Sequence, residues 1–110
     1  MVTCPQQGHL VWIEFGPTIG HEQDGKRPGL VVSDEIYNQK GLFLVVPITS
    51  RRKGYPFEVV LPEGLAVEGV VLADQVRCLD WKSRNARVAG VVPKQTLDEV
   101  VAKLLAIIRG

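Results

Sequence analysis

The chain has 110 residues, of which 45% are apolar and 23% are charged, a balance that indicates one folded domain over residues 1–110 and excludes a disordered chain. Thirteen Lys and Arg residues against twelve Asp and Glu residues leave a net charge of +1, which excludes a protein that grips nucleic acid over its whole surface. Any nucleic-acid binding must therefore come from a local basic patch.

Short apolar runs separated by Gly and Pro predict a mainly β domain. The first run carries a single charge, and the second and third contain β-branched pairs, as buried strands prefer. Five to seven short strands predict a barrel or a sandwich. The expected strands are Leu10–Phe15, Gly29–Ser33, Leu42–Pro47, Phe57–Leu61 and Gly69–Ala73, with Val76–Leu79 continuing the last.

Near the C-terminus the spacing of apolar residues becomes helical. Apolar residues recur from Leu97 to Ile108 at intervals that give one apolar face, which predicts a helix over about 96–108 that covers one face of the sheet. Thr96 is expected at the N-cap, with Glu99 completing a capping box. A short helical turn is also expected from Ser33 or Asp34 towards Asn38.

The cysteines and the hydropathy pattern indicate the compartment. Cys4 and Cys78 are too few for a disulfide framework, and no Cys or His spacing is typical of a zinc site. No window approaches the roughly 20 apolar residues that a membrane-spanning helix needs. We therefore expect a cytoplasmic protein without a metal ion or other cofactor.

Three polar segments differ in composition from the apolar strands that would form the scaffold of the fold. The first is the loop Gly16–Pro28, and loops of about twelve residues without their own structure are often functional. The second, Pro47–Pro56, puts hydroxyl groups beside cations, and in the third, Ala73–Arg77, Asp74 interrupts an apolar strand. The residues of interest are His21, Glu22 and Arg27 in the first segment, Thr49, Ser50, Arg51, Lys53 and Tyr55 in the second, and Asp74, Gln75 and Arg77 in the third.

These residue types could support RNA cleavage without a metal ion. Such a reaction needs a base for the 2′-hydroxyl proton, an acid for the leaving oxygen and a cation for the developing charge. Arg27 suits the phosphate, because a guanidinium can form two parallel hydrogen bonds with it. His21 has an ordinary pKa of about 6.5, suited to proton transfer, whereas Glu22 would need burial to reach that range.

Each of these residues also has an ordinary structural explanation. A loop histidine or an arginine before proline is often only a solvated surface residue, and Thr-Ser after a strand often caps a turn. Asp74 could pair with Arg77 or Arg27, since a buried carboxylate needs a partner. From spacing alone, the sequence predicts a β domain with a polar cluster and leaves its role open.

Four motifs in order resemble the MazF/PemK/Kid toxin family. Gly20–Ser33 reads GHEQDGKRPGLVVS, similar to the family signature G-x-E-Q-x-G-x-R-P-x-x-V-x-S. Pro47–Ser50 resembles the family's P-x-T-[ST], Lys53–Leu61 is similar to the segment that follows it in the MazF branch, and Gly69–Arg77 resembles G-V-x-L-A-D-Q-V. The resemblance extends from the Trp12 strand to the terminal helix.

The resemblance implies a specific fold, activity and partner. Family members are SH3-like β-barrels with a C-terminal helix, and they form homodimers. They are endoribonuclease toxins that cleave single-stranded RNA at short sequences, independently of metal and ribosome, leaving a 2′,3′-cyclic phosphate and a 5′-hydroxyl. A cognate MazE-like antitoxin neutralises each toxin by laying an acidic C-terminal tail over the RNA groove.

The motifs also imply roles for individual residues. Arg27 and Thr49 fall on the family's catalytic arginine and hydroxyl positions, Glu22 on a carboxylate of the MazF branch, and His21 on a histidine of the Kid branch. Asp74 falls on a Kid aspartate, but Leu72 stands where Kid has an arginine, so the full Kid set does not carry over. Glu22 and His21 remain alternative bases. The expected substrate-binding residues are Asp74, Ser50, Arg51, Lys53, Tyr55, Gln75 and Arg77, with Phe57 as a second aromatic platform or a core residue.

Two other functions compete with RNA cleavage. Gyrase poisons of the CcdB type share the architecture but use an aromatic residue near the C-terminus, whereas this chain ends Ile107-Ile108-Arg109-Gly110. The other alternative is an inactive module that binds RNA or antitoxin. Incubation with a long RNA would distinguish a nuclease from both.

Overall fold

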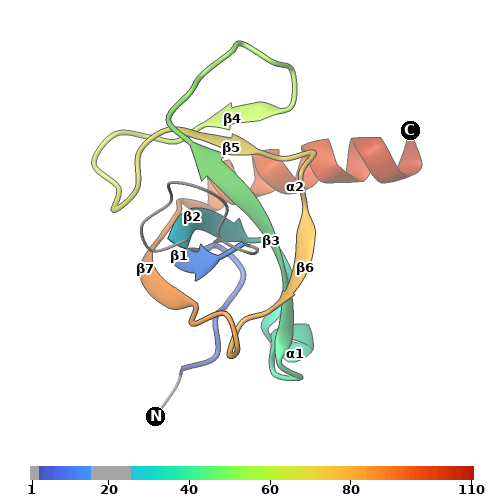
Figure 1. Cartoon of the computed structure of the whole chain (residues 1–110). Helices are drawn as coiled ribbons and strands as arrows, with labels where there is room; N and C mark the ends of the chain where they lie inside the picture. Colours follow the sequence, from blue (N-terminus) through green and yellow to red (C-terminus); the bar gives the residue numbers. More distant parts are fainter. Residues whose placement is uncertain (1–2, 16–25) are drawn as a thin grey trace.

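The computed structural model describes residues 3–15 and 26–110, which form a curved antiparallel sheet and two helices (Figure 1). The short helix α1, Glu35–Asn38, begins at the expected place, because Asp34 caps it by accepting a 2.8 Å hydrogen bond from the Ile36 amide. The strands are β1 His9–Glu14, β2 Lys26–Val31, β3 Leu42–Thr49, β4 Glu58–Val60, β5 Val70–Leu72, β6 Arg77–Asp80 and β7 Arg87–Val91, and the terminal helix α2 is Lys94–Arg109.

The long strand β3 joins the parts of the sheet. The strand order is β4-β5-β3-β2-β1-β7, and β6 pairs with β3 beside this path. Residues Leu42–Val45 of β3 pair with β6, whereas Ile48 and Thr49 pair with β5. Pro47 was expected at the end of the strand, but β3 continues through it. It lies between the residues paired with β6 and those paired with β5, where a missing backbone donor is least disruptive.

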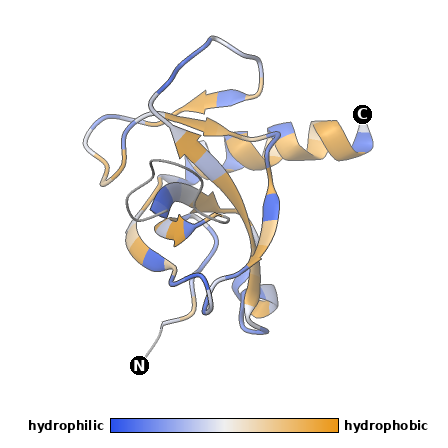
Figure 2. Ribbon diagram, in the orientation of Figure 1, coloured by the Kyte–Doolittle hydropathy of each residue, from blue (hydrophilic) through white to orange (hydrophobic). Residues whose placement is uncertain are grey.

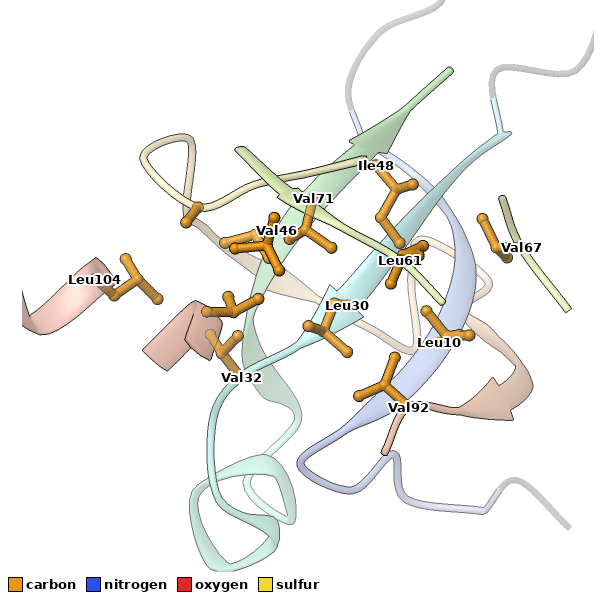
Figure 3. Packing of buried hydrophobic residues seen from close by; sticks show 13 residues of the cluster. Leu10, Leu30, Val32, Val46, Ile48, Leu61, Val67, Val71, Val92 and Leu104 are labelled. Carbon is orange, nitrogen blue, oxygen red and sulfur yellow. The ribbon is translucent and has the colours of Figure 1, made fainter. Parts of the chain in front are cut away.

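Both faces of the central strands are buried, which explains their nearly continuous apolar sequences. Leu10, Leu30 and Val46 stand in register on β1, β2 and β3 and belong to one cluster of buried side chains (Figure 3). Their neighbours in sequence, such as Val11 and Val31, point to the other face and join a second cluster with Phe43 and Trp81. Figure 2 shows that the strands are mainly hydrophobic, whereas the loop between β3 and β4 carries hydrophilic residues.

Helix α2 covers the first of these clusters, as its apolar periodicity predicted, because Val100 and Leu104 belong to that cluster. The predicted capping box is wrong. The helix begins at Lys94, its N-cap is Pro93 with no side-chain cap, and Thr96 is buried in the first turn. Proline is tolerated at this N-cap because it has no amide hydrogen to satisfy, and its backbone there is extended, with a ψ of 149°.

Two further strand predictions need correction. Val76–Leu79 does not continue the preceding strand: β5 ends at Leu72, the Gln75 amide donates to the Leu72 carbonyl in a turn, and β6 pairs with β3 instead. Asp74 therefore lies in a turn and not within a strand. The predicted number of five to seven strands is confirmed, but no strand was expected at the residues that form β7. Its residues are mostly exposed, so it lacks the apolar signal that marks the other strands.

The prediction of a mainly β fold with a C-terminal helix is confirmed. None of the helices in residues 3–15 and 26–110 is long and apolar enough to cross a membrane.

Candidate functional site

Five of the predicted site residues line one hollow of about 590 Å³. They come from three separate parts of the chain: the start of β2, the end of β3 and the β5–β6 turn with the start of β6. The predicted residues in this first hollow are Arg27, Thr49, Ser50, Gln75 and Arg77. The fold thus brings together parts of all three polar segments.

Strand pairing fixes the two residues that the family motifs mark as catalytic. Arg27 lies on β2 opposite Ile13 of β1, so a paired strand carries its exposed side chain. Thr49 ends β3 opposite Val70, and its Oγ1 accepts a 3.2 Å hydrogen bond from the Arg51 amide. That bond orients the hydroxyl oxygen where the chain leaves the sheet.

A second hollow of about 440 Å³ adjoins the first and shares Thr49 and Gln75 with it. The other lining residues come from the β3–β4 loop, from the start of β4, from the end of β5 and from the β5–β6 turn. They are Arg51, Lys53, Tyr55, Glu58, Leu72 and Asp74. We call the two hollows together the groove.

The groove carries charges of both signs. Arg27, Arg51, Lys53 and Arg77 line it as cations, and Glu58, Glu68 and Asp74 line it as carboxylates. Two of these carboxylates accept hydrogen bonds from the protein itself: Glu58 from backbone amides and Asp74 from Tyr55. Cations are thus only a small majority of the charged side chains in the described lining, four against three carboxylates, and the resulting net charge of +1 equals that of the whole chain.

Asp74 has a partner that the sequence did not suggest. Its Oδ2 accepts a 2.6 Å hydrogen bond from Tyr55 Oη, whereas its Oδ1 is buried and has no partner among the described residues. The Tyr55 ring stands beside Phe57, with ring centroids 5.7 Å apart. Tyr55 is 45% exposed and Phe57 is half-buried, so of the two only Tyr55 presents a largely open ring.

The Tyr55–Asp74 contact predicts a shifted titration. The hydrogen bond to Asp74, then burial and the carboxylate charge, raise the pKa of the Tyr55 phenol above its ordinary value of 10.0. Because the folded-state pKa is raised, the stabilising contribution is complete below pH 10 and is lost as the pH rises through the higher pKa.

This shift can be measured in a Tyr37→Phe background, in which Tyr55 is the one remaining tyrosine. We expect the tyrosinate absorbance of that protein to rise at a higher pH than in a free tyrosine peptide. Asp74→Asn should move the midpoint back towards 10, because the amide carries no charge to favour the neutral phenol. An unchanged midpoint would show that the contact does not persist in solution.

Two of the predicted catalytic residues, His21 and Glu22, lie outside the described residues. The groove residues that were missed from the sequence include Trp12, Glu58 and Glu68. Trp12 lies in an apolar run, and only its 40% exposure distinguishes it from its buried neighbours. Within the described residues, no three His, Cys, Asp or Glu side chains gather as a metal site would need.

Comparisons with known proteins point to one family. The family model described as PemK-like, MazF-like toxin of type II toxin–antitoxin system matches residues 6–108. The chain is 47% identical over 105 residues to the endoribonuclease toxin MazF of Escherichia coli (strain K12), covering 94% of each chain.

Solved structures from Deinococcus radiodurans agree with this assignment. The crystal structure of MazF (Form-I) superposes with a TM-score of 0.87 at 52% identity, covering 97% of this chain and 98% of that chain. A MazF chain in a crystal structure of MazE-MazF (Form-II) gives a TM-score of 0.86 at 48% identity, covering 97% of both chains.

Proposed function

Because the chain belongs to the PemK-like, MazF-like toxin family of type II toxin–antitoxin systems, we propose that its groove is the RNA-cleaving site of an endoribonuclease toxin. The chain is an RNA-cleaving toxin that a cognate antitoxin neutralises, as in the related MazE-MazF complex. The observation that carries the assignment of the site is the groove itself, which joins Arg27, Thr49 and Arg77 from distant parts of the chain.

The proposed reaction is an intramolecular transesterification of the RNA that needs no metal ion. The 2′-oxygen next to the cut attacks the phosphorus and loses its proton to a base, the bond to the 5′-oxygen breaks, and that oxygen takes up a proton from an acid. The products are a 2′,3′-cyclic phosphate and a 5′-hydroxyl. Arg27 binds the phosphate and stabilises its charge, Thr49 positions it, and Glu22 or His21 acts as the base.

The remaining groove residues would hold the RNA on either side of the cut. Arg51, Lys53 and Arg77 can contact backbone phosphates, and Ser50 and Gln75 offer hydrogen bonds to base edges or phosphates. The exposed ring of Tyr55 is a platform on which an unpaired base can stack. Such contacts require splayed bases, which supports single-stranded RNA as the substrate. We further propose that the RNA is cut at a short sequence and without the ribosome.

The partners follow from the same groove. A groove lined by four cations suits the acidic C-terminal tail of a MazE-like antitoxin, which would compete with RNA for it. We further propose a homodimer that works in the cytoplasm, where messenger RNA is available.

The mechanism can be tested with an RNA whose 2′-hydroxyl at the cut site is replaced by hydrogen. We expect this RNA to resist cleavage, because the attacking oxygen is missing, while its unmodified twin is cut in the presence of EDTA. Mass spectrometry of the fragments should show cyclic phosphate and 5′-hydroxyl ends. Cleavage of the modified RNA would indicate attack by water, and loss of cleavage in EDTA would indicate a metal-dependent reaction.

A further inference from the structure

The loop between β3 and β4 folds back onto a carboxylate at the start of β4. Glu58 Oε2 accepts a 3.1 Å hydrogen bond from the Lys53 amide, and Glu58 Oε1 accepts one of 3.0 Å from the Gly54 amide. Both carboxylate oxygens thus accept hydrogen bonds from two successive backbone amides. Glu58 is the first residue of β4 and lines the second hollow.

The local sequence favours this arrangement. Gly54 has a φ of +75°, a conformation that few other residues adopt, and it turns the chain so that two amides face the same way. The Glu58 amide donates a 3.0 Å hydrogen bond to the Tyr55 carbonyl, which closes the turn next to the carboxylate. The side chain and the backbone of Glu58 therefore hold the same turn from both sides.

Two more contacts fix the part of the loop that leads into β4. Tyr55 Oη donates to Asp74, and Lys103 Nζ of helix α2 donates a 2.6 Å hydrogen bond to the Pro56 carbonyl. The loop thus has anchors on the β5–β6 turn and on α2. The tip that carries Lys53, however, is held by Glu58.

We propose that Glu58 is a positioning residue for RNA binding: by fixing the Lys53 and Gly54 amides, it holds the cations and the aromatic ring of the loop against the second hollow. This inference rests on the proposed function. A loop that is ordered before binding loses less conformational entropy when RNA binds, so the benefit falls on affinity. Glu58 accepts backbone hydrogen bonds with both carboxylate oxygens, so we assign it no part in proton transfer.

The experiment compares wild-type protein with Glu58→Ala, Glu58→Gln and a control, Glu63→Ala, which removes an exposed carboxylate from the loop after β4. For Glu58→Ala we expect KM for RNA to rise about tenfold with kcat within about twofold. Binding of an RNA with hydrogen at the critical 2′-position should weaken by a similar factor. Glu58→Gln should fall between, because its amide keeps one acceptor oxygen, and Glu63→Ala should match the wild type.

A readout independent of activity is amide hydrogen exchange measured by NMR. In Glu58→Ala the Lys53 and Gly54 amides should exchange at least about tenfold faster, while amides of β3 keep their protection. The proposal is wrong if KM is unchanged, if kcat alone falls, or if RNA binding tightens. Tighter binding would mean that the carboxylate competes with RNA phosphate for the two amides.

The same measurements separate this inference from the function on which it rests. If wild-type protein neither binds nor cuts RNA, the proposed function fails and the positioning role fails with it. If wild-type protein cuts RNA and Glu58→Ala cuts it with unchanged KM, only the positioning role fails.

Discussion

Replacing Arg27 with alanine should lower kcat/KM for RNA cleavage by at least about 10³-fold, the loss expected when a preorganised cation is removed from a developing charge. Arg27 is exposed on a paired strand, so the free energy of unfolding should change by less than about 1 kcal/mol. Cleavage of a labelled RNA and denaturant-induced unfolding of the same preparation measure the two effects.

Two companion variants make the result specific. Arg27→Lys keeps a positive charge without the two-pronged geometry, so it should recover only part of the activity. Arg109→Ala removes an exposed cation from the last turn of α2 and should cleave like the wild type. If Arg27→Ala cuts RNA at the rate of Arg109→Ala, the groove described above is not the site of phosphate stabilisation.

Replacing Gly69 with alanine should destabilise the protein by about 3 kcal/mol and also reduce cleavage. A Cβ on Gly69 would lie 2.3 Å from the Thr49 carbonyl oxygen, and the residue has a φ of +128°. The unfavourable φ and the forced backbone shift each cost about 1–2 kcal/mol. Because the displaced backbone belongs to Thr49, the hydroxyl that lines both hollows must move as well.

Gly64→Ala is the matched control on the same loop. Gly64 also has a positive φ, +88°, but a Cβ there meets nothing within 4 Å. Its cost should therefore be only the conformational one, about 1 kcal/mol, with full RNA cleavage. Denaturant unfolding and RNA cleavage of both variants provide the comparison. Equal stability of the two would show that the close approach to Thr49 does not constrain the fold.

Much of the β core could be predicted because burial leaves a direct mark on sequence. Leu10 and Val11 point to opposite faces of the sheet, yet both are fully buried. The segment Leu10–Ile13 is therefore one apolar run in the sequence. The sequence of β7 carries no such mark. Its residues become a strand because β1 offers an unpaired edge, and backbone hydrogen bonding does not depend on side-chain type.

The N-terminus of α2 shows a different limit. Thr96 and Glu99 form a pattern that is typical of a capping box, but the helix already begins at Lys94 after Pro93. Thr96 is buried within the helix, and Val100 and Leu104 of the same helix belong to the core cluster. Local capping contributes about 1 kcal/mol, which tertiary packing of an apolar face easily exceeds.

The candidate site was also predicted only in part from the sequence. Motif order identified Arg27, Thr49, Ser50, Gln75 and Arg77, and all five line one hollow. No pattern in the sequence linked Tyr55 to Asp74, nineteen residues away, or Lys103 to Pro56, forty-seven residues away. His21 and Glu22 lie outside the described residues, so their roles remain predictions.

By itself, the sequence determined that this chain forms a small β domain with a terminal helix, because periodic burial and turn residues act over a few positions. The sequence also identified the family, because the four family motifs can be recognised in order along the chain without knowledge of the fold. Tertiary structure alone decided which charges face the groove and which are tied to the protein. Hydrogen bonds such as those from the Lys53 amide to Glu58 and from Tyr55 to Asp74 depend on distances that only the folded chain creates.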